Sequence, residues 1–432
     1  MLLDKNAIKM HCIGEVKDQW LASPDSFPVF LTEISKETKT QNEQYMQAVS
    51  DDFRKLLKSF PMNPKARGKW KQKTFGMLEN VLCEETMIGV HHVMDQRTMD
   101  AFQDELRDFL RHVRAFAPEL SLEGIGQAVR NYVVYAMFNE INQIKPGFNM
   151  AGFGYSMLYP FTDNYIDSPE YSDREKIEYN QIIRDKIEGK EVHPITLHQQ
   201  KTCELLSAIE SEYPRDSDAT IFTLLALMLE AQEKSIRQQN RGAVLSAEER
   251  LDISLFKGGL SVLIDRFFVK KEITDADLLF YFGFGFFLQL ADDLQDIRED
   301  SVKGHQTLFT VDLRCEQEEK IVNKMLHFVH RMMHAYQAEN EPFKYFILSN
   351  CDQLIFSSII GSKEYFSREY LDTLERYFPV TYPFLENAKR NQPENKDIKM
   401  QDKYMKILDE MICRTNHIAQ LRGITFHLQN LR

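Results

Sequence analysis

Apolar residues recur at helical spacing along most of the chain. A clear example is the segment 98–116, whose apolar residues share one helical face: Phe102, Leu106, Phe109, Leu110 and Val113. No alternating strand pair, Asn-Gly hairpin turn or internal repeat is evident. Glycine (18 of 432 residues) and proline (14) are both scarce, which also favours helix over turn-rich folds. The sequence therefore predicts an all-α protein.

The sequence also indicates the cellular compartment of the protein. The longest nearly apolar stretch, Leu278 to Ala291, is shorter than the roughly 20 residues that cross a bilayer and suits a buried core helix. At the N-terminus, Asp4 and Lys5 stand where a signal peptide needs apolar residues. The six cysteines form no CxxC pair, as is usual for free thiols in a reducing compartment. We therefore expect a cytoplasmic protein with no stable membrane span.

The net charge bears on the possible partners, and the composition bears on how the chain divides into regions. The 53 basic and 65 acidic residues give a net charge of −12, which argues against a nucleic-acid partner. Residues 1–100 form a helical N-terminal portion of undisclosed role, and residues 101–390 hold the candidate chemistry. A polar linker and a C-terminal helix are expected over residues 391–432.

A long acidic helix is predicted between Thr274, which can form a capping box with Asp277, and Gly304, a plausible stop. At 100° per residue, one stripe of this helix carries five polar side chains: Gln289, Asp292, Asp293, Asp296 and Asp300. The opposite side is apolar, so the helix should be buried and its carboxylates neutralised by cations or bases. Ligands that are all oxygen favour Mg²⁺.

A second helix repeats this arrangement upstream. Asp163 and Asp167 lie four residues apart, just before Ser168-Pro169 ends the helix, and Tyr159 shares their face. On the later acidic helix, the stripe towards the N-terminus meets small and aromatic residues: Phe282, Gly285 and Phe286. Two such helices facing each other would form an apolar pocket with a metal-binding mouth. Such a pocket suits a long hydrocarbon that ends in a phosphate group.

These motifs resemble those of the trans-prenyl diphosphate synthases and their class I terpenoid synthase relatives. LQLADDLQD, residues 288–296, followed by VKGHQT, resembles the second aspartate-rich motif of that superfamily. DNYIDS resembles the first motif, with Asn164 in place of its second aspartate. FKGGLS resembles the lysine-bearing helix between the motifs, with Gly258-Gly259 at the break in that helix. The resemblance spans roughly residues 140–390.

The resemblance implies an isoprenoid (terpenoid) synthase-type helical bundle with an N-terminal helical extension, acting on a prenyl diphosphate. A homodimer is one assembly compatible with it. It implies two or three Mg²⁺ ions held by six aspartates: Asp163, Asp167, Asp292, Asp293, Asp296 and Asp300. The residues implied in catalysis are Asp163, Asp292, Lys257, Arg376 and Tyr377. Those implied in substrate binding are Gln289, Lys257, Lys303, Arg174, Phe282, Phe286, Gly285 and Tyr159.

Three reactions of this superfamily compete. Cyclisation by a terpene synthase is favoured by the acidic second motif and by the Arg376-Tyr377 pair, which resembles a mark that such enzymes carry some eighty residues beyond it. Chain elongation is disfavoured, because Arg174 stands alone where elongating enzymes carry an arginine pair. Head-to-head condensation, as in squalene and phytoene synthases, is compatible with Asp163 and Asp167. A helical scaffold without chemistry is the alternative from a different class.

Overall fold

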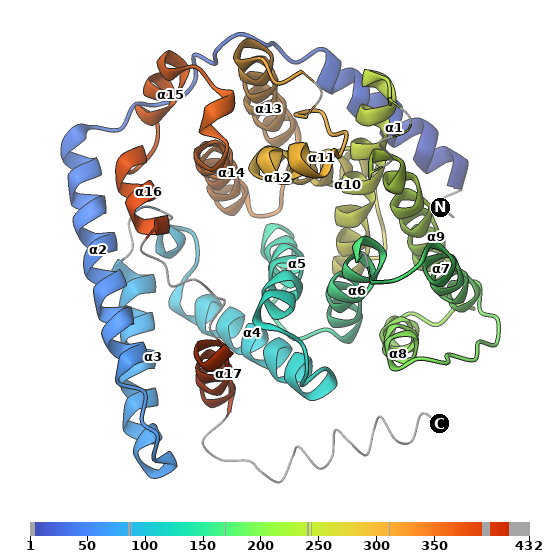
Figure 1. Cartoon of the computed structure of the whole chain (residues 1–432), viewed down its shortest axis with the longest axis horizontal. Helices are drawn as coiled ribbons and strands as arrows, with labels where there is room; N and C mark the ends of the chain where they lie inside the picture. The colour runs from blue at the N-terminus through green and yellow to red at the C-terminus, as the bar shows by residue number, and fades with distance from the viewer. Residues whose placement is uncertain are drawn as a thin grey trace.

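The computed structural model describes residues 5–84, 87, 89–168, 170–239, 242, 244–310, 312–390 and 398–413. Within these ranges the protein is all-α, with 17 α-helices and no strand, as the sequence predicts (Figure 1). None of the helices in the described ranges is both long enough and apolar enough to cross a membrane.

The central part of the chain forms a bundle in which α10 (Ala247–Val269) and α11 (Asp275–Gln295) pack along each other. Other helices surround this pair (Figure 1). They are α5 (Leu122–Ile141), α6 (Met150–Asp167), α7 (Asp173–Ile187), α8 (Leu197–Glu212), α9 (Ala219–Ser235), α13 (Cys315–Ala335) and α14 (Glu341–Gly361). The short helices α12 (Ile297–Lys303), α15 (Arg368–Glu375) and α16 (Tyr382–Arg390) complete this part.

The N-terminal portion has two structural roles. Helix α1 (Lys5–Leu21) packs into the main core, where Trp20 meets Phe286 and Phe328 edge to face at 5.4 and 5.9 Å between ring centroids. Helices α2 (Lys36–Lys58) and α3 (Arg67–Glu84) share a small apolar cluster with α17 (Ile398–Ile412). Helix α4 (Gln96–Phe116), which contains the predicted segment 98–116, packs against α5 and α17.

The domain boundaries at residues 100 and 390 stay predictions, although α1 contributes directly to the core of the central bundle. Most of the expected polar linker, residues 391–397, lies outside the described residues. The expected C-terminal helix corresponds to α17.

Two glycines set the distance between α10 and α11. A Cβ atom on Gly285 would lie 2.1 Å from the carbonyl oxygen of Gly258, and one on Gly258 would lie 2.6 Å from that of Gly285. The two backbones therefore touch with no side chain between them. The helix break expected at Gly258-Gly259 is wrong, because α10 runs through both residues unbroken. The missing side chains serve close helix packing instead.

The acidic helix is interrupted near its acidic end. Its start is confirmed, since Thr274 and Asp277 form the predicted capping box. The single helix expected up to Gly304 is wrong, because the backbone of Asp296 (φ −101°, ψ 11°) separates α11 from α12. Helix α12 then ends at Gly304, whose φ of 77° suits glycine. Asp300 nevertheless remains close enough to Asp292 and Asp293 for its charge to raise their pKa values.

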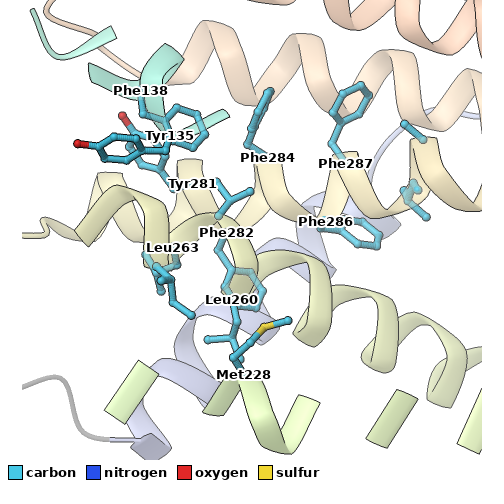
Figure 2. Packing of buried hydrophobic residues seen from close by; sticks show 14 of the residues in the cluster. Tyr135, Phe138, Met228, Leu260, Leu263, Tyr281, Phe282, Phe284, Phe286 and Phe287 are labelled. Carbon is cyan, nitrogen blue, oxygen red and sulfur yellow. The ribbon is translucent and has the colours of Figure 1, made fainter. Parts of the chain in front are cut away.

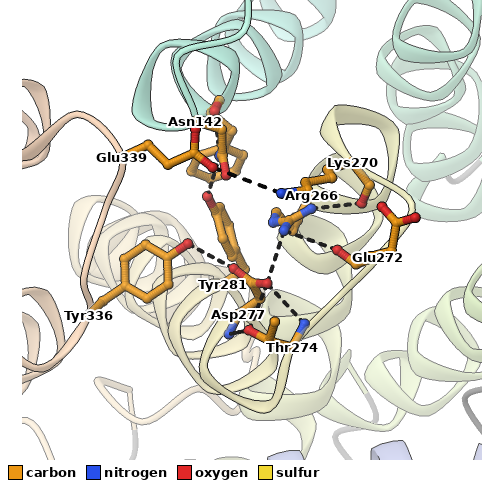
Figure 3. A network of polar contacts seen from close by, with 10 residues as sticks. Asn142, Arg266, Lys270, Glu272, Thr274, Asp277, Tyr281, Tyr336 and Glu339 are labelled. Atoms are coloured by element: carbon orange, nitrogen blue, oxygen red, sulfur yellow. Dashed lines mark hydrogen bonds and ion pairs between the residues drawn. The ribbon is translucent and has the colours of Figure 1, made fainter. Parts of the chain in front are cut away.

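A buried polar network holds the α10–α11 connection at the end remote from the acidic residues (Figure 3). The Arg266 guanidinium donates to Asp277 at 2.9 Å, and the Tyr336 hydroxyl donates to the same carboxylate at 2.8 Å. Asn142 of α5 donates to the Tyr281 hydroxyl at 2.8 Å. Burial alone would raise the pKa of Asp277. The backbone N–H of Thr274, the charge of Arg266 and the hydroxyl of Tyr336 outweigh this effect and lower the pKa.

Candidate functional site

A cavity of about 220 Å³ lies between α5, α6, α9, α10 and α11, with residues of α7 and α8 completing its wall. Polar side chains from five helices gather at one end: Gln127, Arg130, Thr162, Gln232, Lys257 and Asp292. Much of the remaining wall is aliphatic, with Ile183, Ile187, Leu206, Leu225, Met228 and Leu229. We call the polar end the mouth of the cavity.

The lining residues of α10 and α11 show how far the cavity extends from its mouth. On α10, Lys257, Ser261 and Asp265 follow one another at four-residue intervals along the cavity wall, a rise of about 12 Å. On α11, the lining runs from Asp292 to Gly285, a similar rise of about 10 Å. The lining therefore extends about two helical turns from the mouth, to the level of Asp265.

Asp163 joins three helices at the mouth. It is only 8% exposed, and its Oδ1 accepts a 2.6 Å hydrogen bond from the Gln232 side chain on α9. Its Oδ2 lies 3.7 Å from the Lys257 ammonium on α10. The structure thus brings together two of the residues implied by the sequence, Asp163 and Lys257, although 94 positions separate them in the chain.

Asp292 faces the same mouth from α11. Water reaches its carboxylate, yet protein surrounds it on most sides, and this burial raises its pKa. Lys257 and Arg130 act in the opposite direction and lower the pKa, whereas the negative charges of Asp300 and Asp163 raise it further. The two acidic helices are therefore close enough for their carboxylates to repel each other, and both feel the positive charge of Lys257.

The remaining acidic residues have different surroundings. Asp293 is 5% exposed and accepts a 2.9 Å hydrogen bond from Gln289, while its Oδ2 has no partner, and burial raises its pKa to about 8. Burial and neighbouring carboxylates raise the pKa of Asp296 to about 6. Burial also raises the pKa of Asp300, although His305, 3.0 Å away, opposes this. The side chain of Asp167 lies outside the described residues.

Three of the residues implied in substrate binding line the cavity: Tyr159, Gly285 and Gln289. Phe282 and Phe286 do not line it, so placing them in the pocket was wrong. Both rings are fully buried in the core and point away from Phe284 and Phe287 (Figure 2). The lining stripe of α11 centres on Gly285 and Asp292, and the two phenylalanines lie about 60° to 100° round the helix from Gly285.

Four further residues stand away from the cavity lining, contrary to the roles expected for them. Arg174 is exposed on α7 and pairs with Glu178 at 2.8 Å. Arg376 pairs with Glu33, and the Tyr377 ring packs 5.8 Å from that of Phe27. Each therefore has a structural partner elsewhere. Lys303 is exposed on α12 and pairs with Glu299. Its positive charge remains near enough to Asp296 and Asp300 to oppose the rise in their pKa values.

Sequence reasoning missed several residues of the cavity. Arg130 and Gln232 come from helices outside the acidic motifs, and no local spacing marks either. Asp265 and Tyr155 could have been considered, because each lies about two turns from a predicted site residue on the same helix. Asp265 follows Lys257 by eight residues, and Tyr155 precedes Asp163 by eight.

The donors at the mouth suit a hard divalent cation. They are carboxylate oxygens, and burial and neighbouring carboxylates raise the pKa values of Asp292 and Asp296, an effect that a bound cation would oppose. Among the described residues, no three acidic, histidine or cysteine side chains already converge as a preformed metal site. An ion at this mouth would thus take part of its coordination from water or an anionic ligand, as Mg²⁺ usually does. Comparisons with family models, curated proteins and solved structures found no match to this chain.

Proposed function

We propose that the protein is a class I terpene synthase, which converts a prenyl diphosphate to a terpene hydrocarbon or alcohol and releases diphosphate. One observation carries the proposal. Asp163, Lys257 and Asp292, from three separate helices, meet at the polar mouth of a largely apolar cavity. A ligand that suits both parts has an anionic, metal-binding head and a hydrocarbon tail.

Asp163 and Asp292 would hold Mg²⁺ from opposite sides of the mouth, with Asp296 as a further oxygen donor. When bound, Mg²⁺ neutralises the negative charge that develops on the departing diphosphate. Lys257 supplies a fixed positive charge to the same group, and Arg130 lies within electrostatic range of Asp292 to do likewise.

The cavity below the mouth would protect the reactive carbon chain. Its aliphatic wall excludes bulk water from a carbocation, which would otherwise be quenched at once. Tyr155 and Tyr159 line the wall from α6, and an aromatic face attracts a cation. These residues do no covalent chemistry; they position the chain and stabilise the charge it acquires.

A condensing prenyltransferase, either chain-elongating or head-to-head, is the second candidate. One observation favours it: Arg376 and Tyr377, whose spacing argued for cyclisation, are engaged away from the cavity. The mouth itself suits any reaction that ionises a prenyl diphosphate. The two candidates differ in whether a second prenyl substrate is needed.

Incubation with prenyl diphosphates of C10 to C25, with and without isopentenyl diphosphate, tests the proposal. Diphosphate release and a hydrocarbon or alcohol from one substrate alone would support a terpene synthase. A longer prenyl diphosphate formed only with both substrates would establish elongation, and a joined product from two identical chains would establish head-to-head condensation. No turnover, together with no change in melting temperature on adding Mg²⁺ and inorganic diphosphate, would favour a scaffold.

A further inference from the structure

A single carboxyl group lines the cavity at the end remote from the mouth. Asp265 on α10 lines the cavity two turns below Lys257 and is only 4% exposed. Its Oδ1 is buried and has no hydrogen-bond partner. Native proteins rarely leave such an atom unsatisfied, and ordered water is the usual partner where protein provides none.

The neighbouring groups do not supply the missing donor. The Tyr155 hydroxyl, on the opposite helix α6, donates to the backbone carbonyl oxygen of Ser261 at 3.2 Å. The Ser261 hydroxyl donates to the carbonyl oxygen of Gly258 at 2.7 Å. A water molecule needs only about 10–15 Å³ of such space, so the cavity of about 220 Å³ can hold one beside Asp265.

Burial also favours the neutral form of this carboxyl group. The pKa of Asp265 is raised well above its ordinary value because the group is fully enclosed. A neutral carboxyl group has one O–H donor and a carbonyl oxygen that accepts. It can therefore fix both the position and the orientation of a bound water, whereas an already protonated acid is a poor proton acceptor.

We propose that Asp265 holds a water molecule at the end of the cavity remote from the mouth and that this water captures the carbocation, so that the enzyme forms a terpene alcohol. The inference rests on the proposed function and specifies its product. Asp265 is a positioning residue in this scheme, because it acts through the water. The aliphatic wall above it would keep other water away.

The chemical step balances without any further reactant. Ionisation breaks the C–O bond and leaves its electron pair on the diphosphate. A lone pair of the water oxygen then forms a new C–O bond to the carbocation. The resulting oxonium loses one proton, which ends on an oxygen of the released diphosphate. The sum is prenyl diphosphate plus water, giving an alcohol and hydrogen diphosphate.

Product analysis of two substitutions tests this role. Asp265→Asn keeps a donor and an acceptor, whereas Asp265→Leu removes both at similar size. Reactions run in ¹⁸O-labelled water should give labelled alcohol with the wild type and with Asp265→Asn. For Asp265→Leu we expect the alcohol-to-hydrocarbon ratio of the products to fall at least tenfold. If the Asp265→Leu variant does not fold, the Asp265→Val variant is tested in its place.

Glu318→Leu is the matched control. Glu318 on α13 is another fully buried carboxyl group without hydrogen-bond partners, but it does not line the cavity. Its substitution should leave the product ratio unchanged. The inference is overturned if the wild type releases diphosphate but yields only hydrocarbon, or if Asp265→Leu retains the alcohol. Failure of the wild type to release diphosphate from any prenyl diphosphate would instead overturn the proposed function, and the inference with it.

Discussion

At the scale of single residues, the two central aspartates of the mouth are held in different ways. Asp163 is fixed by Gln232 and Lys257, from two other helices. Burial and the charges of Asp300 and Asp163 raise the pKa of Asp292, whereas the positive charges of Lys257 and Arg130 lower it. A cation bound beside Asp292 would oppose the repulsion between these carboxylates.

We expect Asp292→Asn and Asp163→Asn each to reduce turnover by at least about a hundredfold, because each removes a charge that stabilises the leaving diphosphate through its metal. Both proteins should fold, since an amide fits either position. Diphosphate release measures the loss, and melting with Mg²⁺ and inorganic diphosphate should lose its upward shift. Asp100→Asn, at an exposed site on α4, serves as the control. Near wild-type turnover in either mouth variant would remove the metal-site assignment.

A second prediction at this scale concerns pH. Burial, with a smaller contribution from Asp312, raises the pKa of Glu318 from 4.5 to about 8. The folded protein thus binds this proton more tightly than the unfolded chain. The resulting stability is fully present below pH 4.5 and is lost as pH rises towards 8, at up to about 1.4 kcal/mol per pH unit.

Glu318→Gln should flatten this dependence and make the protein more stable than the wild type at pH 8. Urea unfolding at several pH values between 5 and 8 measures both slopes. Parallel stability curves for the two proteins would show that Glu318 does not take up a proton on folding.

At the scale of helices, the contact between α10 and α11 depends on having no side chain at two positions. Gly285→Ala would place a methyl group against the backbone of α10, where no flexible side chain can move aside. We expect a loss of about 1–3 kcal/mol or more in unfolding free energy. Gly126→Ala in α5 is the control, because nothing lies within 4 Å of its Cβ position. It should be neutral or stabilising by up to about 1 kcal/mol. Equal effects of the two substitutions would contradict the close contact.

Helix ends were predictable from sequence where a side chain or a glycine marks them locally. The capping box at Thr274 and the stop at Gly304 are examples. The break at Asp296 was not, because no proline or glycine announces it. The error at Phe286 has another cause: its partner Trp20 lies on α1, more than 260 residues away in the chain. A helical wheel shows which residues share a face but not what covers that face.

At the scale of the whole molecule, the chain's two tryptophans belong to different hydrophobic clusters. Trp20 is part of the main core, and Trp70 lies in the small cluster of α2, α3 and α17. The all-α class followed from helical periodicity throughout the chain. The pairing of α6 with α9, α10 and α11 around one mouth could only be suspected, because it depends on contacts between distant segments.

The two clusters should unfold at different denaturant concentrations. Among the residues that the structure describes, three buried side chains form the small cluster, so it buries little apolar surface and should open first. Fluorescence of Trp20→Phe reports on Trp70, and that of Trp70→Phe reports on Trp20. We expect the Trp70 signal to change at a lower urea concentration. Coincident transitions for both variants would instead show that α2, α3 and α17 unfold together with the bundle.

The touching backbones of α10 and α11 also have an evolutionary consequence. A side chain larger than hydrogen at position 258 or 285 requires the helices to separate, and their separation would shift Lys257 relative to Asp292 across the mouth. Substitutions at these two positions should therefore be correlated in evolution. In descendants that keep the mouth, both should remain glycine together. Lineages that lose one glycine should drift at the other and at the aspartates, because selection on the shared geometry would have ended.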